Sequence, residues 1–308
     1  MKRLIIDSDT GSDDAVALVM ALKYPDTKVE AITVGFGNVP MEQGVQNAIY
    51  TVELCGADVP VYAGLDRPLI REGRTGQYVH GEDGMGDIGL PLSGKKPAPG
   101  HAVDVLIDTI NRYAGDITLV TLGPLMNVAV ALLRDPSIAH KVNDCVIMGG
   151  VGYGYGNVTP VAEYNIWADP EAAQIVFQSG MPLTMVGIDV NNKSAVFTEA
   201  DSAALRGIGT PLAEFCVAIQ AKLINYVSER TGIRSFSLPD PITMGVALDP
   251  FMATEVKNLF VNVELGDGYT RGQTVVDHLH VTGKAPNTKV VLDASREGFI
   301  TMLHNAVR

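Results

Sequence analysis

The feature of this sequence that most constrains its fold is an alternation of short, β-branched apolar runs with longer segments of helical period. Strands are expected at Arg3–Ile6, Val29–Val34, Val59–Tyr62, Ile117–Thr121, Asp144–Met148 and Leu183–Val186. Crossover helices are expected between them, at Asp13–Lys23, Glu42–Cys55, Ala102–Tyr113, Leu125–Arg134 and Pro170–Gln178. This alternation predicts an α/β fold with an open, mainly parallel sheet flanked by helices.

The C-terminal half predicts a different mixture of elements. One longer helix is expected from Pro211 to Glu229, because its apolar residues fall on one stripe. Another helix is expected over Asp240–Leu248. The stretch Val256–Leu292 predicts a β-ribbon, and a last helix is expected from Ser295.

Composition and charge exclude several classes of function. The net charge is −12, and the 23 basic residues form no run that could neutralise a row of phosphates, so no nucleic-acid partner is expected. No apolar run approaches membrane-spanning length, and the first apolar stretch is too short for a signal peptide. Three widely spaced cysteines, Cys55, Cys145 and Cys216, indicate neither a disulfide frame nor a zinc site. A single cytoplasmic domain, residues 1–308, is expected.

Carboxylates crowd into the segment that follows the first expected strand. Asp7, Asp9, Asp13 and Asp14 lie within eight residues. Like charges this close raise one another's pKa, and a divalent cation removes that penalty. Oxygen ligands favour calcium or magnesium over zinc. Helix capping by Ser12 or Asp13 would explain one aspartate but not four, so a metal site is expected here, where parallel strands end.

The acidic loop leaves one alternative enzyme class open. An aspartate pair after a first strand also begins the haloacid-dehalogenase-like phosphatases, which form a phosphoryl-aspartate intermediate. That motif has Thr or Val two residues beyond the second aspartate, where this chain has Gly11. It also makes no use of a pair such as Asp13 and Asp14.

The loop resembles the Asp-x-Asp-x-Gly-x-Asp-Asp signature of the inosine-uridine-preferring nucleoside hydrolases. Further motifs follow in that family's order along nearly the whole chain: Gly37-Asn38, His80-Gly81-Glu82, Gly123–Asn127, Met148–Gly150, Ala162–Pro170 and Asp240-Pro241. The resemblance implies the nucleoside-hydrolase, Rossmann-like form of the α/β fold. It also implies an N-glycosyl hydrolase that cleaves ribonucleosides to free base and ribose.

The resemblance implies a calcium site as well. By position, Ca²⁺ would be held by Asp9, Asp14, Asp240 and the main-chain carbonyl of Leu122, together with the ribose diol and a water. Asp9 corresponds to the general base that takes a proton from the metal-held water, which then attacks C1′. Asp7 corresponds to a residue that supports the loop from behind.

The same comparison assigns the substrate contacts. The residues expected to contact substrate are Asp13, Asn38, His80, Met148, Glu163, Asn165, Tyr226 and Asp240. Several carboxylates around the sugar would stabilise the positive charge of an oxocarbenium-like transition state. The resemblance further implies a role in nucleoside salvage and assembly into a homodimer or homotetramer.

The chain departs from the family pattern at one position. In the best-known members a histidine precedes the last metal-binding aspartate and is thought to protonate the departing base, whereas this chain has Pro239. Tyr226, Glu229, Arg230 and His80 are candidates for that role, and purine versus pyrimidine preference stays open. A second hypothesis is therefore a protein that binds ribose or a ribosyl compound and hydrolyses nucleosides poorly.

Overall fold

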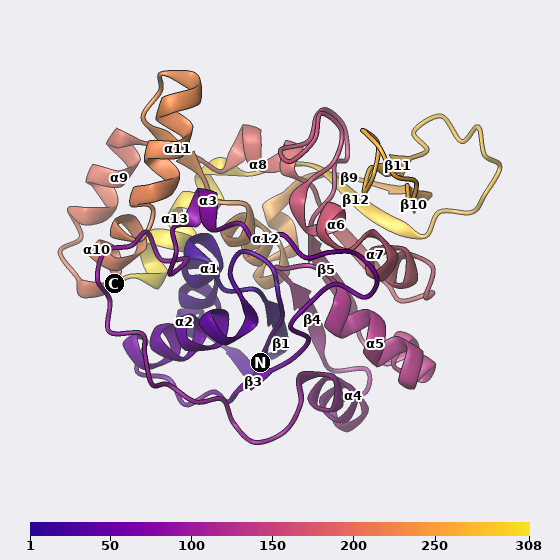
Figure 1. Cartoon of the computed structure of the whole chain (residues 1–308), viewed down its shortest axis with the longest axis horizontal. Helices are drawn as coiled ribbons and strands as arrows, with labels where there is room; N and C mark the ends of the chain where they lie inside the picture. Colours follow the sequence, from indigo (N-terminus) through magenta and orange to yellow (C-terminus); the bar gives the residue numbers. More distant parts are fainter.

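The computed structural model describes all 308 residues and has one large sheet at its centre (Figure 1). The strand order is β3-β2-β1-β4-β5-β6-β12-β9. These strands are β1 (Lys2–Ser8), β2 (Thr27–Val34), β3 (Val61–Ala63), β4 (Thr118–Thr121), β5 (Asp144–Met148), β6 (Leu183–Val186), β9 (Ala253–Leu259) and β12 (Thr288–Ala294). All neighbours pair in parallel except β9, which runs antiparallel to β12 at the edge. The predicted open, mainly parallel α/β sheet is confirmed.

Helices cover both faces of this sheet. One face carries α1 (Ser12–Lys23), α2 (Met41–Leu54), α12 (Pro239–Leu248) and α13 (Arg296–Ala306), and the other carries α4 (Ala102–Arg112), α5 (Met126–Arg134) and α7 (Pro170–Phe177). In β1, Leu4 and Ile6 belong to the core on the first face and Ile5 to the core on the second. Successive side chains of a strand point to opposite faces, so a strand covered on both sides is apolar at every position.

Several short elements complete the chain. They are α3 (Gln77–His80), α6 (Tyr164–Ala168), α8 (Ile188–Ser194), α9 (Glu199–Arg206), α10 (Pro211–Ala218), α11 (Ala221–Thr231), η1 (Pro136–His140) and η2 (Pro250–Met252). Four of them contribute to the cavity described below: α3, α6, α8 and α11.

The single helix predicted from Pro211 to Glu229 is wrong. The chain forms α10 and α11, with a break between them at Gln220. Gln220 is fully buried, and its Nε2 donates to the carbonyl of Ser12 while its Oε1 accepts from Ser12 Oγ, both at 3.0 Å. The break lets this amide reach the N-terminus of α1, so a tertiary contact overrides the continuous helical period.

The predicted C-terminal β-ribbon is correct only in part. A separate antiparallel pair, β10 (Val261–Val263) and β11 (Thr274–Val276), projects at the right of Figure 1. The flanking strands β9 and β12 instead extend the main sheet. A second small pair, β7 (Val196–Thr198) and β8 (Ser235–Ser237), was not predicted, because strands of three residues carry too little alternation to detect.

The strand order places a crevice at the centre of the molecule. β2 and β3 lie on one side of β1, whereas β4, β5 and β6 lie on the other, so the order reverses at β1. Ligands of open α/β sheets bind outside the carboxyl ends of strands at such a reversal. The acidic loop leaves β1 at this point.

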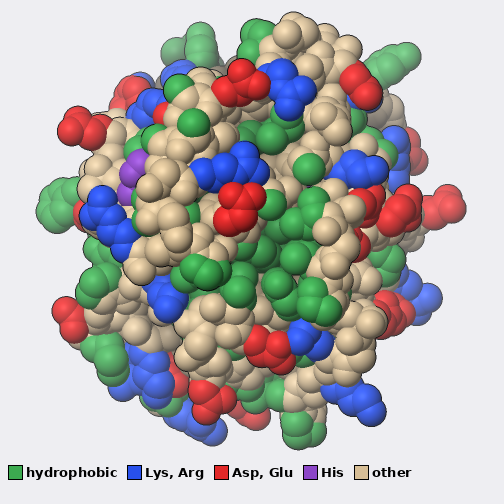
Figure 2. All heavy atoms as spheres, turned by 90° about the vertical axis from the view of Figure 1, so that its left-hand side faces the viewer, with side chains coloured by type: hydrophobic (Ala, Val, Ile, Leu, Met, Phe, Trp, Pro, Cys, Tyr) green, Lys and Arg blue, Asp and Glu red, His purple; other side chains and the backbone are tan.

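Charged side chains are interspersed on the face that carries α9 and α10. Figure 2 shows Lys and Arg side chains scattered among acidic and apolar ones there, without a continuous basic stripe. That face therefore lacks the electrostatic footprint of a nucleic-acid site. None of the helices combines the length and the apolar character that a membrane span requires.

Candidate active site

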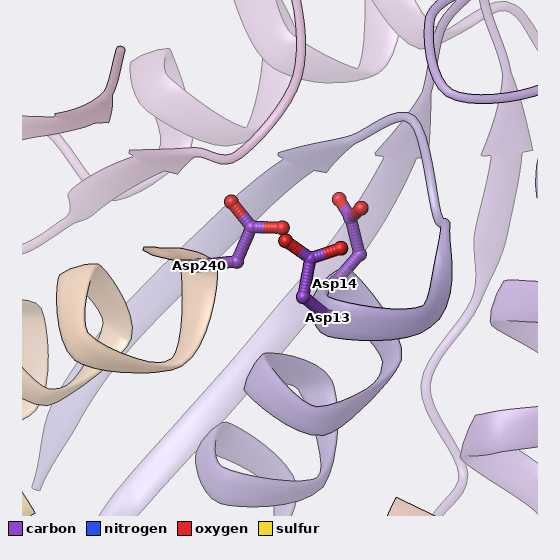
Figure 3. Close-up of side chains that lie close together, drawn as sticks. All are labelled: Asp13, Asp14 and Asp240. Carbon is purple, nitrogen blue, oxygen red and sulfur yellow. The ribbon is translucent and has the colours of Figure 1, made fainter. Parts of the chain in front are cut away.

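Three aspartates converge where two helices begin (Figure 3). Asp13 and Asp14 lie in the first turn of α1, and Asp240 lies in the first turn of α12. One carboxylate oxygen of each lies within 4.8 Å of the others, and all three residues are buried. Helix N-termini favour negative charge, which partly offsets the repulsion. The fold thus unites carboxylates from the two ends of the sequence.

Asp9 lies beside this cluster and is held by Asn38. Asp9 Oδ2 accepts a hydrogen bond from the backbone N–H of Asn38 at 2.6 Å. The Asn38 Nδ2 donates to Asp9 Oδ1 at 3.3 Å and to Asp14 Oδ2 at 3.1 Å. A Cβ on Gly37 would lie 1.9 Å from Asp9 Oδ2, and one on Gly123 would lie 2.9 Å from Asp9 Cβ. The close packing of Asp9 therefore requires glycine at both positions.

Asp14 also accepts hydrogen bonds that stabilise the acidic loop. Its Oδ2 accepts from the backbone N–H of Gly11 at 2.9 Å, and its Oδ1 accepts from Ser8 Oγ at 2.8 Å. The carboxylate that caps α1 is therefore Asp14, which accepts from the backbone of the N-cap residue Gly11, and not Ser12 or Asp13, the two residues considered for this role in the alternative to a metal site. Capping fixes Asp14 in place but does not remove its charge.

Asp7 points away from the cluster. Its Oδ1 accepts hydrogen bonds from Thr33 Oγ1 at 2.6 Å and from Asn127 Nδ2 at 2.9 Å. Burial raises the pKa of Asp7 to about 7, although both hydrogen bonds lower it. These contacts join β1 to β2 and α5 behind the acidic loop.

Burial makes the acidic cluster costly in the absence of a cation. Loss of hydration raises the pKa of Asp9, Asp13 and Asp240, and repulsion from neighbouring carboxylates raises it further. Asp13 Oδ1 is buried and accepts no hydrogen bond. A divalent cation would replace protons as the neutralising charge, and a donor set made of oxygens alone suits calcium or magnesium. The residues present therefore fit a metal ion.

A cavity of about 300 Å³ opens beside the cluster. All the predicted site residues except Asp9 and Asp14 line it: Asp13, Asn38, His80, Leu122, Met148, Glu163, Asn165, Tyr226 and Asp240. Asp9 and Asp14 lie behind Asn38, which is hydrogen-bonded to both. The fold thus gathers every predicted site residue at one place.

The residues around α6 form one wall of the cavity. Glu163 caps α6, with Oε1 accepting from the N–H of Asn165 at 2.8 Å and Oε2 accepting from the N–H of Gly150 at 2.9 Å. Asn165 Nδ2 donates to the carbonyls of Leu122 at 2.6 Å and Met148 at 3.2 Å. Burial raises the pKa of Glu163 to about 7. The Leu122 carbonyl is thus hydrogen-bonded to Asn165, and both residues line the cavity.

The opposite wall carries His80 and Tyr226. The Nδ1 of His80 lies 3.0 Å from Ser12 Oγ and 3.7 Å from Asp13 Oδ1. Tyr226 comes from α11, and its ring makes an edge contact with Tyr78, with ring centroids 5.9 Å apart. This part of the cavity therefore combines the aromatic side chains of Tyr78 and Tyr226 with the imidazole of His80.

Only some of the candidates for the leaving-group acid lie at the cavity. His80, Tyr226 and Pro239 line the cavity, whereas Glu229 and Arg230 do not. The Arg230 guanidinium instead stacks 3.5 Å from the centre of the Tyr226 ring.

Sequence reasoning missed several lining residues. Tyr78, Asn157, Asn191 and Asn192 also line the cavity. Asn191 and Asn192 follow β6, so the rule that ligands bind beyond strand ends gave a signal for them. No comparable signal marks Asn157, which lies in an irregular loop.

The acidic, cation-compatible cavity lies at the switch point of an open α/β sheet, where folds of this class bind their ligands. The sequence profile of inosine-uridine preferring nucleoside hydrolases matches residues 4–301. The chain belongs to this family of glycosyl hydrolases. The match over almost the whole chain removes the support for the phosphatase alternative.

Named relatives share the full length of the chain. A pyrimidine-specific ribonucleoside hydrolase, RihA of Salmonella paratyphi C, is 40% identical over 306 residues, which cover 97% of this chain and 96% of the relative. The structure of the plant nucleoside hydrolase PpNRh1 superposes with a TM-score of 0.93 at 35% identity, covering 99% and 98% of the two chains. A purine-preferring ribonucleoside hydrolase from Gardnerella vaginalis gives a TM-score of 0.91 at 33% identity, with the same coverage.

The packing of Asp9 predicts that Gly37→Ala lowers both the stability of the protein and its affinity for a divalent cation. The added Cβ would meet the Asp9 carboxylate at 1.9 Å, so Asp9 must move. We expect destabilisation by about 1–3 kcal/mol, measured by urea unfolding, together with loss of divalent-cation binding. Gly245→Ala in α12 is the control, because its Cβ would make only ordinary contacts at 3.5 Å. Equal stability of the two variants would contradict the packing argument.

Buried carboxylates predict a pH-dependent stability of the metal-free protein. Asp7 and Glu163 have pKa values of about 7 in the folded chain, above the values near 4 that they take when unfolded. Their stabilising effect is complete below the unfolded pKa and is lost as pH rises through 7. In EDTA, the free energy of unfolding should fall between pH 5 and pH 8, by on the order of 1 kcal/mol per pH unit for each group. Asp7→Asn should reduce this slope, and an unchanged slope would exclude Asp7 as a contributor.

Proposed function

We propose that this chain hydrolyses the N-glycosidic bond of ribonucleosides in a calcium-dependent reaction that uses water as the nucleophile. The observation that carries the proposal is the convergence of buried carboxylates beside a cavity of about 300 Å³ that is also lined by the polar side chains of Asn38 and Asn165. Membership of the nucleoside hydrolase family supports it. Nucleoside salvage and assembly into homo-oligomers stay predictions.

The cation site is assigned to Asp9, Asp14, Asp240 and the carbonyl of Leu122. Asp13 also has a carboxylate oxygen within 4.8 Å of those of Asp14 and Asp240. When bound, calcium would lower the pKa of a water molecule and bind the ribose diol. It would also keep the neighbouring carboxylates ionised, because a positive charge reverses the shifts that burial imposes.

Asp9 is assigned as the general base. A base must be ionised and must be held within hydrogen-bond reach of the water. The two hydrogen bonds from Asn38 hold both Asp9 oxygens in place, and Asp9 packs so closely against Gly37 and Gly123 that neither position has room for a Cβ. Asp9 would take the proton of the water as that water attacks C1′.

The sugar is assigned to the polar part of the cavity. Asp13, Asn38, Glu163 and Asn165 present oxygen and nitrogen atoms suited to ribose hydroxyls, and Met148 lines the same wall. Multiple contacts orient C1′ toward the water. The carboxylates also stabilise the positive charge that develops on the ribose ring as the bond breaks.

The nucleobase is assigned to the wall formed by His80, Tyr226 and Pro239. Proline has no group that can donate a proton at this position, so the base must leave with help from other residues or from water. The relatives do not agree on the base, since one is named pyrimidine-specific and another purine-preferring. Ribonucleosides as a class are therefore the proposed substrates.

Calcium removal tests the proposed reaction. We expect the protein to release reducing sugar from inosine, uridine, adenosine or cytidine in calcium, and to lose this activity in excess EGTA. Calorimetric titration of calcium supplies a readout besides activity, with one ion bound per chain. Asp240→Asn should weaken calcium binding, because an amide contributes one neutral oxygen in place of a charged carboxylate. Ribose binding without sugar release would favour the second hypothesis, a ribosyl-compound binding protein.

The assignment of Asp9 as base predicts the effect of Asp9→Asn. The amide preserves size and can still offer an oxygen to the cation, but it cannot accept a proton. We expect kcat to fall by about 10²–10⁴. Asp66→Asn is the control, because Asp66 is exposed and lies outside the cavity. A kcat within twofold of the parent protein would remove Asp9 from the mechanism.

A further inference from the structure

Asn191 is a buried amide without a structural partner. It lies in α8, lines the cavity, and is only 1% exposed. Its Oδ1 is buried and accepts no hydrogen bond. Leaving a buried carbonyl oxygen without a donor is unfavourable, so nearly all such groups in proteins have one. The donor is therefore expected to come from whatever fills the cavity.

Neighbouring polar residues already make the structural contacts of α8. Asp189 Oδ1 accepts from the N–H of Gly152 at 2.7 Å, and Ser194 Oγ donates to Asp293 Oδ1 at 3.2 Å. Asn191 lies one helical turn after Ile188, and both line the cavity. This face of α8 is turned toward the ligand space.

Asn191 shares the cavity with residues of α11. Ile188 and Asn191 of α8 line it together with Leu223 and Tyr226 of α11. Tyr226 is one of the residues to which the nucleobase is assigned above, so a nucleobase beside Tyr226 lies in the same cavity as Asn191.

Asn191 also lies near the departure from the family pattern. The N–H of Leu238 donates to the carbonyl of Ala195 at 3.1 Å, which joins the end of α8 to the start of α12. Pro239 follows at once and lines the cavity. The unpartnered amide and the proline that cannot donate a proton thus face the same space.

We propose that the side-chain amide of Asn191 hydrogen-bonds the polar edge of the nucleobase in the bound ribonucleoside. This inference rests on the proposed hydrolase function. A primary amide offers one acceptor and two donors, so it matches the N–H and C=O edge of uracil or hypoxanthine. Turned over, it matches the ring nitrogen and amino edge of cytosine or adenine. An amide does not titrate, so Asn191 positions the base and is not its proton donor.

Asn191→Leu tests this contact, because leucine has nearly the same size and no polar atoms. The substrates are uridine, inosine and 4-nitrophenyl β-D-ribofuranoside, whose leaving group lacks the polar edge of a base. We expect kcat/KM for at least one of the two nucleosides to fall by about tenfold or more, since the polar edge of its base loses its partner. For the nitrophenyl riboside we expect kcat/KM to stay within about twofold.

Control variants separate this role from a structural one. Ser194→Ala removes a polar contact of the same helix away from the cavity. It should leave unchanged the ratio of kcat/KM for each nucleoside to kcat/KM for the nitrophenyl riboside. Asn191→Ala should reproduce the shifted ratio if the leucine variant does not fold. An equal fall on all substrates, or no fall on either nucleoside, would overturn the assignment of Asn191. Failure of the unmodified protein to cleave any substrate would instead overturn the proposed function itself.

Discussion

The interaction on which the site of this protein depends is the mutual repulsion among its buried carboxylates. Asp9, Asp13, Asp14 and Asp240 lie together where water is largely excluded, and burial followed by repulsion from neighbouring carboxylates raises the pKa of Asp9, Asp13 and Asp240. A bound cation would neutralise these charges. A fold that tolerates this cost is one in which the acidic site serves a function.

The scaffold restricts each carboxylate by a different means. Asp14 is fixed by capping its own helix, Asp9 by the hydrogen bonds of Asn38, and Asp240 by its place in the first turn of α12. Gln220 ties α11 to the start of α1, so the wall carrying Tyr226 is positioned by the same loop that positions the acids. The acidic cluster and the part of the cavity proposed to bind the base are thus connected through one buried contact.

The sequence predicted the sheet and most of its helices because their signals are local. A strand buried on both faces is apolar throughout, as in Leu4–Ile6, and the crossover helices show clear apolar stripes. The predictions failed where a long-range contact decided the outcome. The break at Gln220 depends on Ser12, more than 200 residues earlier in the chain, and no helical period reveals it. The short pair β7 and β8 depends equally on pairing across the chain.

The sequence by itself determined which residues are predicted to carry the chemistry, because the acidic loop and its companion motifs are sets of residue types in a fixed order. It also determined that the loop follows a buried parallel strand. Only the tertiary structure decided which atoms meet: that Asp13 joins Asp14 and Asp240, that Asp14 is the cap, and that the amide of Asn191 is left without a partner beside the cavity. The sequence gives the type and order of the residues, whereas distances, burial and hydrogen-bond partners arise only when distant segments pack against one another.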